Sequence, residues 1–281
     1  MAATVHERIA AARQALIGAG LSAEDAAIDA AVLARHALGW DRASLLARGR
    51  ESAPPAFDEV YAQLIRRRTA REPVALITGS REFWGLDFRV SSGVIVPRPE
   101  TELVVEQALA CARDAGSRRL VDVGTGSGCL AVALASELPG ARVLAIDTSL
   151  EALRVAARNA RRHGVADRVH LVQATLLEAV GAPVDLIVSN PPYVPDTETL
   201  PPEVARYEPP EALFAGPDGL DVLRALISSA PARLAPGGRF IVEFGFGQRA
   251  AVESLARAAG WSRVGFVNDL QDIPRVAVME H

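Results

Sequence analysis

The chain has 281 residues, of which 49% are hydrophobic and 23% are charged, and its formal net charge at pH 7 is -4. A chain of this length forms one large domain or two ordinary ones, each with enough residues to bury a core. The slightly acidic balance argues against broad electrostatic binding to duplex nucleic acid, so no stable nucleic-acid complex is expected, although a local basic patch is compatible with it.

The cysteines and the hydropathy pattern indicate a soluble protein of a reducing compartment. Two cysteines, Cys111 and Cys129, give neither a disulfide framework nor the spacing of a metal site. The first turns carry Glu7, Arg8 and Arg13 in place of the apolar region of a signal peptide. No stretch approaches the roughly 18–20 uninterrupted apolar residues of a membrane span. We therefore expect a cytoplasmic protein without membrane contact.

Residues 1–73 are predicted to form a small, all-helical domain. Apolar residues recur at helical spacing from the start of the chain, and Ser22 opens a second helix that ends at Gly39. Asp41 is placed to cap a short third helix. Two prolines then interrupt the chain before a fourth helix, predicted over residues 57–69. Together these helices offer enough apolar residues for a core of their own.

The last of these helices ends in a basic cluster, Arg66-Arg67-Arg68, which Arg71 follows. A run of like charge at a helix end is usually a solvated face, and we interpret the cluster in this way. Contact with a phosphate group or with an acidic partner is the alternative that the sequence leaves open.

A β-hairpin over residues 74–97 is predicted to link the helical part to the rest of the chain. The pattern changes there to alternating apolar residues and glycine, with strands expected near residues 76–79 and 82–90. The next stretch, residues 94–102, is held extended by its two spaced prolines. Thr101 is expected to cap a helix. The stiff, charged stretch before that helix is interpreted as a plain linker or as a lid or substrate wall.

Residues 98–281 alternate between strands, glycine-containing turns and helices, which is typical of a doubly wound sheet. Because the last two strands have no helix between them, they are expected to pair antiparallel through a hairpin. The predicted fold class is therefore α/β, a mostly parallel, seven-stranded sheet preceded by a small all-α domain. The strands are predicted at residues 120–123, 142–147, 169–172, 185–188, 239–243, 264–267 and 275–279. The helices are predicted at residues 102–113, 129–138, 150–163, 220–234 and 248–259.

A glycine-rich loop, Gly124-Thr125-Gly126-Ser127-Gly128, leaves the first of these strands and opens a helix. Glycines let the backbone approach a ligand closely, and the helix N-terminus offers free N–H donors. Cys129 stands where a dinucleotide fingerprint has its third glycine, so no pyrophosphate is required. Asp147 ends the next strand, where a carboxylate accepts the hydroxyls of a ribose. S-adenosyl-L-methionine fits this pattern, and an ordinary tight turn is the alternative.

The stretch Asn190-Pro191-Pro192-Tyr193 follows the buried strand over residues 184–188. Its two consecutive prolines end the strand at once and make a stiff, extended turn. Ligands of open α/β sheets bind at this carboxyl edge. Oxygen atoms in such a turn accept both hydrogens of a planar NH2 group, and the tyrosine ring covers the group. The turn therefore predicts a site for a flat nitrogen nucleophile.

The glycine loop and the Asn-Pro-Pro-Tyr turn together resemble those of class I methyltransferases, Rossmann-like enzymes that use S-adenosyl-L-methionine to methylate exocyclic or amide nitrogens. Further stretches narrow the resemblance to the peptide chain release factor glutamine-N5 methyltransferase family. The helical domain is also similar to the one in that family, so the resemblance covers essentially the whole chain. The narrowing stretches are residues 82–85, Pro97-Arg98-Pro99-Glu100-Thr101-Glu102, residues 207–213 and Gly219-Leu220-Asp221.

This resemblance implies that a methyl group is transferred to the side-chain amide nitrogen N5 of a glutamine. The glutamine lies in the Gly-Gly-Gln motif of class 1 peptide chain release factors. The helical domain would recognise this substrate protein, and a monomer is expected. Catalytic roles are implied for Asn190, Pro191 and Tyr193, and substrate contacts for these residues and Pro192.

The resemblance also implies where S-adenosyl-L-methionine is bound. Cofactor contacts are implied for the loop from Gly124 to Gly128, for Asp147 and for Asn190. After the third strand, many relatives carry an acidic residue followed by an aromatic one, whereas this chain has Thr175-Leu176. Leu176 is expected to pack its apolar surface against the adenine ring.

Three other functions remain open on the sequence alone. A sibling enzyme that methylates a glutamine on a ribosomal protein would share the cofactor and the turn but differ in the stretch after Val96. An adenine-N6 nucleic-acid methyltransferase would suit the same pocket, but the net charge and the lack of a separate basic recognition domain argue against it. A binding module without catalysis would show no affinity for S-adenosyl-L-methionine.

Overall fold

The computed structural model describes residues 3–115 and 118–280, which divide into two compact units. The helical unit comprises the chain up to Gly79 together with Leu200–Tyr207, and the sheet unit comprises the rest. The helical unit thus extends beyond the predicted boundary at residue 73 and recruits a segment from the middle of the chain. Within the described residues, no helix is both long and apolar enough to cross a membrane.

The predicted helices of the N-terminal part are confirmed, with their caps. Ser22 accepts a hydrogen bond from the backbone N–H of Asp25. Gly39 ends that helix at a φ of 64°, in the left-handed region that glycine enters at low cost. Asp41 caps the next helix by accepting from the N–H of Ser44. The helices of this unit are α1 (Val5–Gly18), α2 (Ala23–Leu38), α3 (Arg42–Arg48), α4 (Phe57–Thr69), α5 (Val74–Thr78) and α9 (Pro202–Ala205).

The helical unit has an apolar core of its own. Leu16 of α1 and Leu33 of α2 are fully buried in it. Phe57 and Tyr61 of α4 stack with their ring centroids 4.8 Å apart. The buried hydroxyl of Tyr61 donates to the carbonyl of Ala30 at 2.8 Å, so its polar atom enters the core with a partner.

The interpretation of the basic cluster as a solvated face holds for Arg66 and Arg67, which are exposed, but is wrong for Arg68 and Arg71. The side chain of Arg68 is only 8% exposed and donates to Asp29 at 2.6 Å. Arg71 pairs with Glu203 of α9 at 2.7 Å, and Arg67 pairs with Glu72. The acidic partners that these arginines bind are therefore in the chain itself. Because one of them lies in the recruited segment, the sequence around the cluster could not predict it.

The predicted hairpin begins later than expected. Residues 76–78, predicted as strand, belong to helix α5, which starts after Pro73 because a proline suits a helix start. The two strands of the hairpin are β1 (Ser80–Phe83) and β2 (Leu86–Arg89), which pair antiparallel. Trp84 and Gly85 form the turn with positive φ values of 54° and 68°. Two positive φ values match the twist of a two-residue hairpin.

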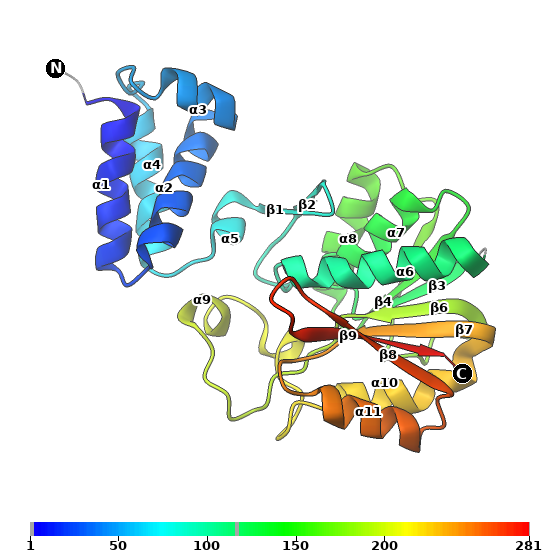
Figure 1. The fold of residues 1–281 in the computed structure, drawn as a ribbon. Helices are drawn as coiled ribbons and strands as arrows, with labels where there is room; N and C mark the ends of the chain where they lie inside the picture. Colours follow the sequence, from blue (N-terminus) through cyan, green and yellow to red (C-terminus); the bar gives the residue numbers. More distant parts are fainter. Residues whose placement is uncertain (1–2, 116–117, 281) are drawn as a thin grey trace. The chain divides into compact units, whose positions relative to one another are not determined.

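The sheet unit contains the predicted seven-stranded, mostly parallel sheet (Figure 1). The strand order is β5-β4-β3-β6-β7-β9-β8, and β9 is antiparallel to both of its neighbours. The predicted hairpin of the last two strands is confirmed. The strands are β3 (Arg119–Val123), β4 (Arg142–Asp147), β5 (Val169–Gln173), β6 (Val184–Ser189), β7 (Leu234–Glu243), β8 (Arg263–Asn268) and β9 (Pro274–Glu280).

Helices cover both faces of this sheet (Figure 1). Successive strand residues enter opposite cores, since side chains alternate across a strand. Leu186 packs with helices α6, α7 and α8, whereas its neighbour Ile187 packs with α10 and α11. Both residues are buried, which explains the apolar run of a central parallel strand. The helices are α6 (Glu102–Ala115), α7 (Cys129–Glu137), α8 (Leu150–Arg162), α10 (Asp221–Ser229) and α11 (Arg249–Ala258).

Two local expectations in this unit are corrected. The helix predicted over residues 220–234 ends at Ser229, because Pro231 starts a separate 3-10 turn. Thr101 does not cap α6. It closes the 3-10 turn Pro99–Thr101 and is 1% exposed, with its hydroxyl hydrogen-bonded inside the unit. The Thr101 hydroxyl therefore forms hydrogen bonds in the interior of the unit and does not cap the helix.

Candidate active site

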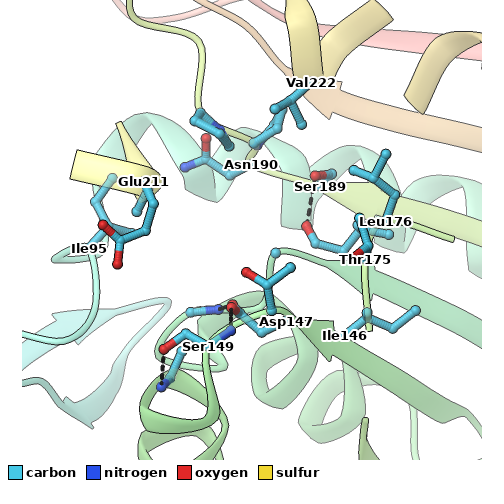
Figure 2. A pocket seen from close by; sticks show the side chains of 18 of the residues that line it. Ile95, Ile146, Asp147, Ser149, Thr175, Leu176, Ser189, Asn190, Glu211 and Val222 are labelled. Carbon is cyan, nitrogen blue, oxygen red and sulfur yellow. Dashed lines mark hydrogen bonds between the residues drawn. The ribbon is translucent and has the colours of Figure 1, made fainter. Parts of the chain in front are cut away.

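A cavity of about 400 Å³ opens at the carboxyl ends of strands β3, β4, β5 and β6. Its position is the edge where open α/β sheets bind ligands. Asp147 and Asn190 lie on opposite sides of it (Figure 2). The strand ends contribute Val123, Gly124, Gly126, Ile146, Asp147, Thr148, Ser149, Ala174, Thr175, Leu176, Ser189, Asn190, Pro191 and Pro192 to the lining.

The glycine loop lines the cavity with two of its five residues. Gly124 and Gly126 face the cavity and adopt φ values of 72° and 54°, so their conformation favours glycine. Thr125 and Ser127 are buried behind them. Gly128 begins helix α7, and a side chain there would meet the Cβ of Ala156 at 3.0 Å. Thr125, Ser127 and Gly128 therefore shape the loop without lining the cavity.

Hydrogen bonds to the Asp122 side chain hold the glycine loop in place. Its Oδ2 accepts from the hydroxyl of Thr125 at 2.6 Å and from the backbone N–H of Ala131 at 3.1 Å. Burial raises the pKa of this carboxyl to about 7, against the opposing effect of these two donors. The carboxylate joins the start of α7 to the loop and so holds the loop in one shape.

Asp147 projects from the end of β4 into the same cavity. Its Oδ2 accepts from the N–H of Gly126 and its Oδ1 from the N–H of Ser149, both at 2.9 Å (Figure 2). Each carboxylate oxygen offers about two lone pairs, so both oxygens keep capacity for a further donor. A ligand hydroxyl at this carboxylate would meet an acceptor that is already oriented.

The wall of the cavity that contains Leu176 is apolar. Leu176 lines it beside Ile146 and Leu226, and no aromatic side chain is among the residues that line the described cavity. Leu176 has a φ of 49°, which costs a residue other than glycine roughly 1–2 kcal/mol. The strained backbone turns Leu176 toward the cavity, where it offers apolar surface to a flat ring (Figure 2).

The Asn-Pro-Pro-Tyr turn forms the opposite wall. Asn190, Pro191 and Pro192 line the cavity, as predicted, directly after Ser189, whose hydroxyl donates to the carbonyl of Val123 at 2.7 Å. Tyr193 does not line it. Instead the Tyr193 hydroxyl donates to Glu243 at 3.1 Å, and burial raises the pKa of the phenol well above its usual range. Tyr193 thus anchors the turn from behind.

Gln248 holds the backbone of this turn. Its Nε2 donates to the carbonyl of Tyr193 at 2.9 Å, and its Oε1 accepts from the N–H of Gly245 at 2.8 Å. Gly219 approaches the same carbonyl so closely that a Cβ there would lie 2.3 Å from the Tyr193 carbonyl oxygen and 3.0 Å from Nε2 of Gln248. Close packing of Gln248 and Gly219 around this carbonyl leaves the turn little freedom to move.

The stretch between the hairpin and α6 forms a third side. Gly93, Val94 and Ile95 line the cavity, which favours the predicted substrate wall over the plain linker. A few residues later, Arg98 donates to both oxygens of Glu208 at 2.6 and 2.7 Å. Burial raises the pKa of Glu208, and Arg98 opposes that effect. This ion pair joins the wall to the segment that carries Glu211, another lining residue.

These features fit S-adenosyl-L-methionine. The backbone of the two glycines that line the cavity suits its amino-acid end, and the Asp147 carboxylate suits a ribose. The wall at Leu176 suits an adenine ring. Of the predicted cofactor residues, Gly124, Gly126, Asp147, Leu176 and Asn190 line the cavity together.

Several residues of the site had no signal of their own in the sequence. Thr101, Glu243 and Gln248 lie 89, 50 and 55 residues along the chain from their partners in the turn, so each reaches it only through tertiary contacts. The lining residues Glu211 and Asp221 fall in stretches that the family resemblance singled out. That resemblance was the available pointer to them.

Comparison with known families identifies both parts of the chain. Residues 7–79 match the family model of the PrmC N-terminal domain, and residues 101–205 match the model of the methyltransferase small domain. The first range agrees with the N-terminal part of the helical unit. The second contains the glycine loop, Asp147 and the Asn-Pro-Pro-Tyr turn.

Curated relatives are similar over most of their length. The release factor glutamine methyltransferase of Xylella fastidiosa (strain Temecula1) is 46% identical, and the match covers 89% of this chain and 92% of the relative. The protein of the same description from Cereibacter sphaeroides is 43% identical, with 96% of each chain covered. The one from Bradyrhizobium diazoefficiens is 47% identical, covering 84% and 81%.

Solved structures share the fold at low identity. The hMettl16 catalytic domain, solved with a MAT2A 3'UTR hairpin, is 18% identical and has a TM-score of 0.58, covering 77% of this chain and 81% of that one. The T. thermophilus 16S rRNA N2 G1207 methyltransferase, solved with AdoMet and guanosine, is 22% identical with a TM-score of 0.53 and covers 72% and 49%. These likenesses establish a methyltransferase fold and no more.

Proposed function

The chain belongs to the release factor glutamine methyltransferase family, and from this premise we propose that its substrate is the Gly-Gly-Gln glutamine of class 1 peptide chain release factors. It is a protein methyltransferase that depends on S-adenosyl-L-methionine. One observation supports the proposal above others. Asn190 and its two prolines form the cavity wall opposite Asp147, so a flat nitrogen on one side would face a cofactor held on the other.

The donor side of the cavity binds and orients the cofactor. When bound, S-adenosyl-L-methionine supplies a methyl group on a positively charged sulfur. Gly124 and Gly126 would let its amino-acid end approach the backbone, and Asp147 would accept from its ribose hydroxyls. Leu176 would pack against its adenine. These residues fix the position of the methyl donor relative to the turn.

An amide nitrogen is a weak nucleophile because it shares its lone pair with the carbonyl. The residues on the substrate side of the cavity would compensate for this weakness. The Asn190 Oδ1 atom and the Pro191 carbonyl would accept the two hydrogens of the substrate NH2 group. Such fixed dipoles stabilise the charge that grows on nitrogen in the transition state. Positioning the two reacting groups contributes the remainder. Stacking of Tyr193 on the substrate amide stays a prediction.

The partner, the oligomeric state and the location of the enzyme follow from the same proposal. The helical unit is proposed to recognise the release factor, and the enzyme is proposed to act as a monomer in the cytoplasm, where release factors work. No stable complex with nucleic acid is proposed, since the net charge is -4.

Methyl-labelled S-adenosyl-L-methionine tests the substrate. The enzyme is incubated with the label and, separately, a purified release factor, ribosomes or DNA. We expect label on the release factor, on the glutamine of its Gly-Gly-Gln motif. Label only on a ribosomal protein would establish the sibling activity instead, and label only on DNA would establish the adenine methyltransferase. Absence of cofactor binding would favour the silent binding module.

A further inference from the structure

A chain of buried polar groups lies behind the Asn-Pro-Pro-Tyr turn. Glu243, at the end of β7, is 1% exposed. Its Oε2 accepts from the Thr101 hydroxyl at 2.7 Å, and its Oε1 accepts from the Tyr193 hydroxyl at 3.1 Å. The Thr101 oxygen in turn accepts from Nδ2 of Asn190 at 2.9 Å. Of these hydrogen-bonded residues, Asn190 is the one that lines the cavity.

Counting protons gives these hydrogen bonds a direction. Thr101 has one hydroxyl proton, and an ionised Glu243 can only accept, so that proton points at Glu243. The Thr101 oxygen is then an acceptor toward Asn190, and only the NH2 end of the Asn190 amide satisfies it. The acceptor end, Oδ1, is thereby left for the substrate.

We propose that Glu243 is a positioning residue for methyl transfer, which, acting through Thr101, keeps the acceptor atom of the Asn190 side chain directed at the substrate amide. The inference rests on the proposed role of Asn190 in binding that amide. Through Tyr193, the same carboxylate also holds the far end of the turn. Two of the predicted site residues are thus set by one carboxylate that touches neither substrate nor cofactor.

Protonation of Glu243 would reverse the direction of the hydrogen bonds from Glu243 through Thr101 to Asn190. A protonated carboxyl donates to the Thr101 oxygen, the Thr101 proton turns to Asn190, and the amide presents its NH2 end to the substrate. The charged groups that act on Glu243 are Glu100, which raises its pKa, and Arg275 of β9, which lowers it. Burial is the largest influence and raises the pKa to about 7, so the carboxyl titrates near neutral pH.

A purely structural role would not require this carboxylate. Ionising a fully buried carboxyl is unfavourable, and apolar residues of similar volume often stabilise a fold as well or better. Glu243 is nevertheless hydrogen-bonded to Tyr193 of the turn and to Thr101, which contacts Asn190, and among the described residues it has no basic partner at hydrogen-bond distance. A buried, titratable group aimed at a candidate site is the pattern expected of a functional one.

A matched pair at Thr101 provides the sharpest test. Thr101→Val keeps the volume but removes the hydroxyl, whereas Thr101→Ser keeps the hydroxyl. We expect kcat for release-factor methylation to fall about tenfold or more in Thr101→Val and to stay near wild type in Thr101→Ser. The Kd for S-adenosyl-L-methionine should be unchanged in both, because Gly124, Gly126 and Asp147 are untouched. Equal kcat values in the two variants would overturn the proposal.

The pH profile separates positioning from packing. In wild type, kcat should fall as pH drops through about 7. Glu243→Gln does not titrate and can accept only one of the two hydroxyl protons, so we expect a lower kcat without that acid limb. The same acid limb in wild type and Glu243→Gln would contradict the proposal, provided that thermal unfolding shows both proteins folded.

A spectroscopic readout is independent of turnover. The side-chain amide of Asn190, observed by 15N NMR and assigned by its loss in Asn190→Ala, should shift with pH near 7 in wild type and not in Glu243→Gln. A pH-independent signal in wild type would overturn the inference. If wild type methylates no release factor, the proposed function fails, and this signal still decides whether Glu243 orients Asn190. If wild type is active and Thr101→Val equals Thr101→Ser, the inference alone fails.

Discussion

The side chain of Gln248 bridges two backbones, because its Nε2 donates to the carbonyl of Tyr193 at 2.9 Å while its Oε1 accepts from the N–H of Gly245. Gln248 stands just before α11, so this helix start and the Asn-Pro-Pro-Tyr turn move as one body. The two prolines restrict the backbone torsions of the turn, and the hydrogen bond from Gln248 ties the turn to the start of α11.

Gln248→Glu should therefore impair methyl transfer. Glutamate keeps the size and still accepts from Gly245, but an ionised carboxylate repels the Tyr193 carbonyl in place of donating to it. We expect kcat/KM for the release factor to fall about tenfold, since a partly buried hydrogen bond is replaced by an unfavourable contact. Steady-state methylation measures it. Gln271→Glu, which adds the same charge at an exposed position, should leave kcat/KM unchanged. Equal losses in the two variants would contradict a specific role for Gln248.

Asp147→Asn should weaken cofactor binding. Asparagine offers one acceptor oxygen where the carboxylate offers two, so Gly126, Ser149 and the ribose compete for it. Hydrogen bonds to a charged group contribute roughly 1.5–3 kcal/mol, which corresponds to about a 10- to 100-fold increase in the Kd for S-adenosyl-L-methionine. Calorimetric titration measures that Kd.

The control for Asp147 is Asp185→Asn. Asp185 also accepts from two backbone N–H groups, those of Arg118 and Arg119, but at the other end of the sheet. This variant should lose stability without losing cofactor affinity. If both variants bound the cofactor as wild type does, the assignment of Asp147 to the ribose would be wrong.

Arg68→Ala should destabilise the helical unit. Removing one partner of a buried ion pair leaves Asp29 without its closest counter-charge, and such truncations cost roughly 3–5 kcal/mol. Arg8→Ala breaks a pair with Asp58 whose side chains are 44% and 49% exposed, so its cost should be about 0–1 kcal/mol. Chemical denaturation of the full chain measures both. Similar free energies of unfolding for the two variants would show that burial of the pair does not matter.

Stability should depend on pH through Glu243. Its pKa is 4.5 in the absence of perturbation and about 7 in the fold, so between these values the folded state binds more protons than the unfolded state. The free energy of unfolding contributed by this group therefore falls as pH rises from about 4.5 to 7. Relative to wild type, Glu243→Gln should gain on the order of 3 kcal/mol across that window. Asp122 titrates in both proteins, so parallel stability curves would contradict the shifted pKa of Glu243.

The sequence predicted most of the sheet unit because its signals are local. The parallel strands are largely apolar runs, and β3 and β6 end in turns where Gly124 and Pro191 each have a single structural use. The strand β4 (Arg142–Asp147) has the predicted bounds, and Asp147 and Asn190 face one cavity as expected. Residues that follow strands of a parallel sheet meet at one edge, so their convergence follows from the fold.

The parts that were wrong or missed depend on distant partners. The sequence around Arg68 predicts an exposed residue, but Arg68 is buried because it pairs with Asp29 and with Glu203 of the recruited segment. Thr101 reads as a cap, yet Glu243, far along the chain, takes its hydroxyl. Tertiary context overrides local preference at such positions.

The most direct test of the proposed site is the turnover of Asn190→Ala with a release factor as substrate. The substitution removes one of the two acceptors for the substrate NH2 group, and losing one such fixed group typically lowers kcat about 100- to 1000-fold. We predict a loss of that size, with thermal unfolding close to wild type and a far smaller change in the Kd for S-adenosyl-L-methionine. Near-normal methylation of the release factor by folded Asn190→Ala would contradict the account.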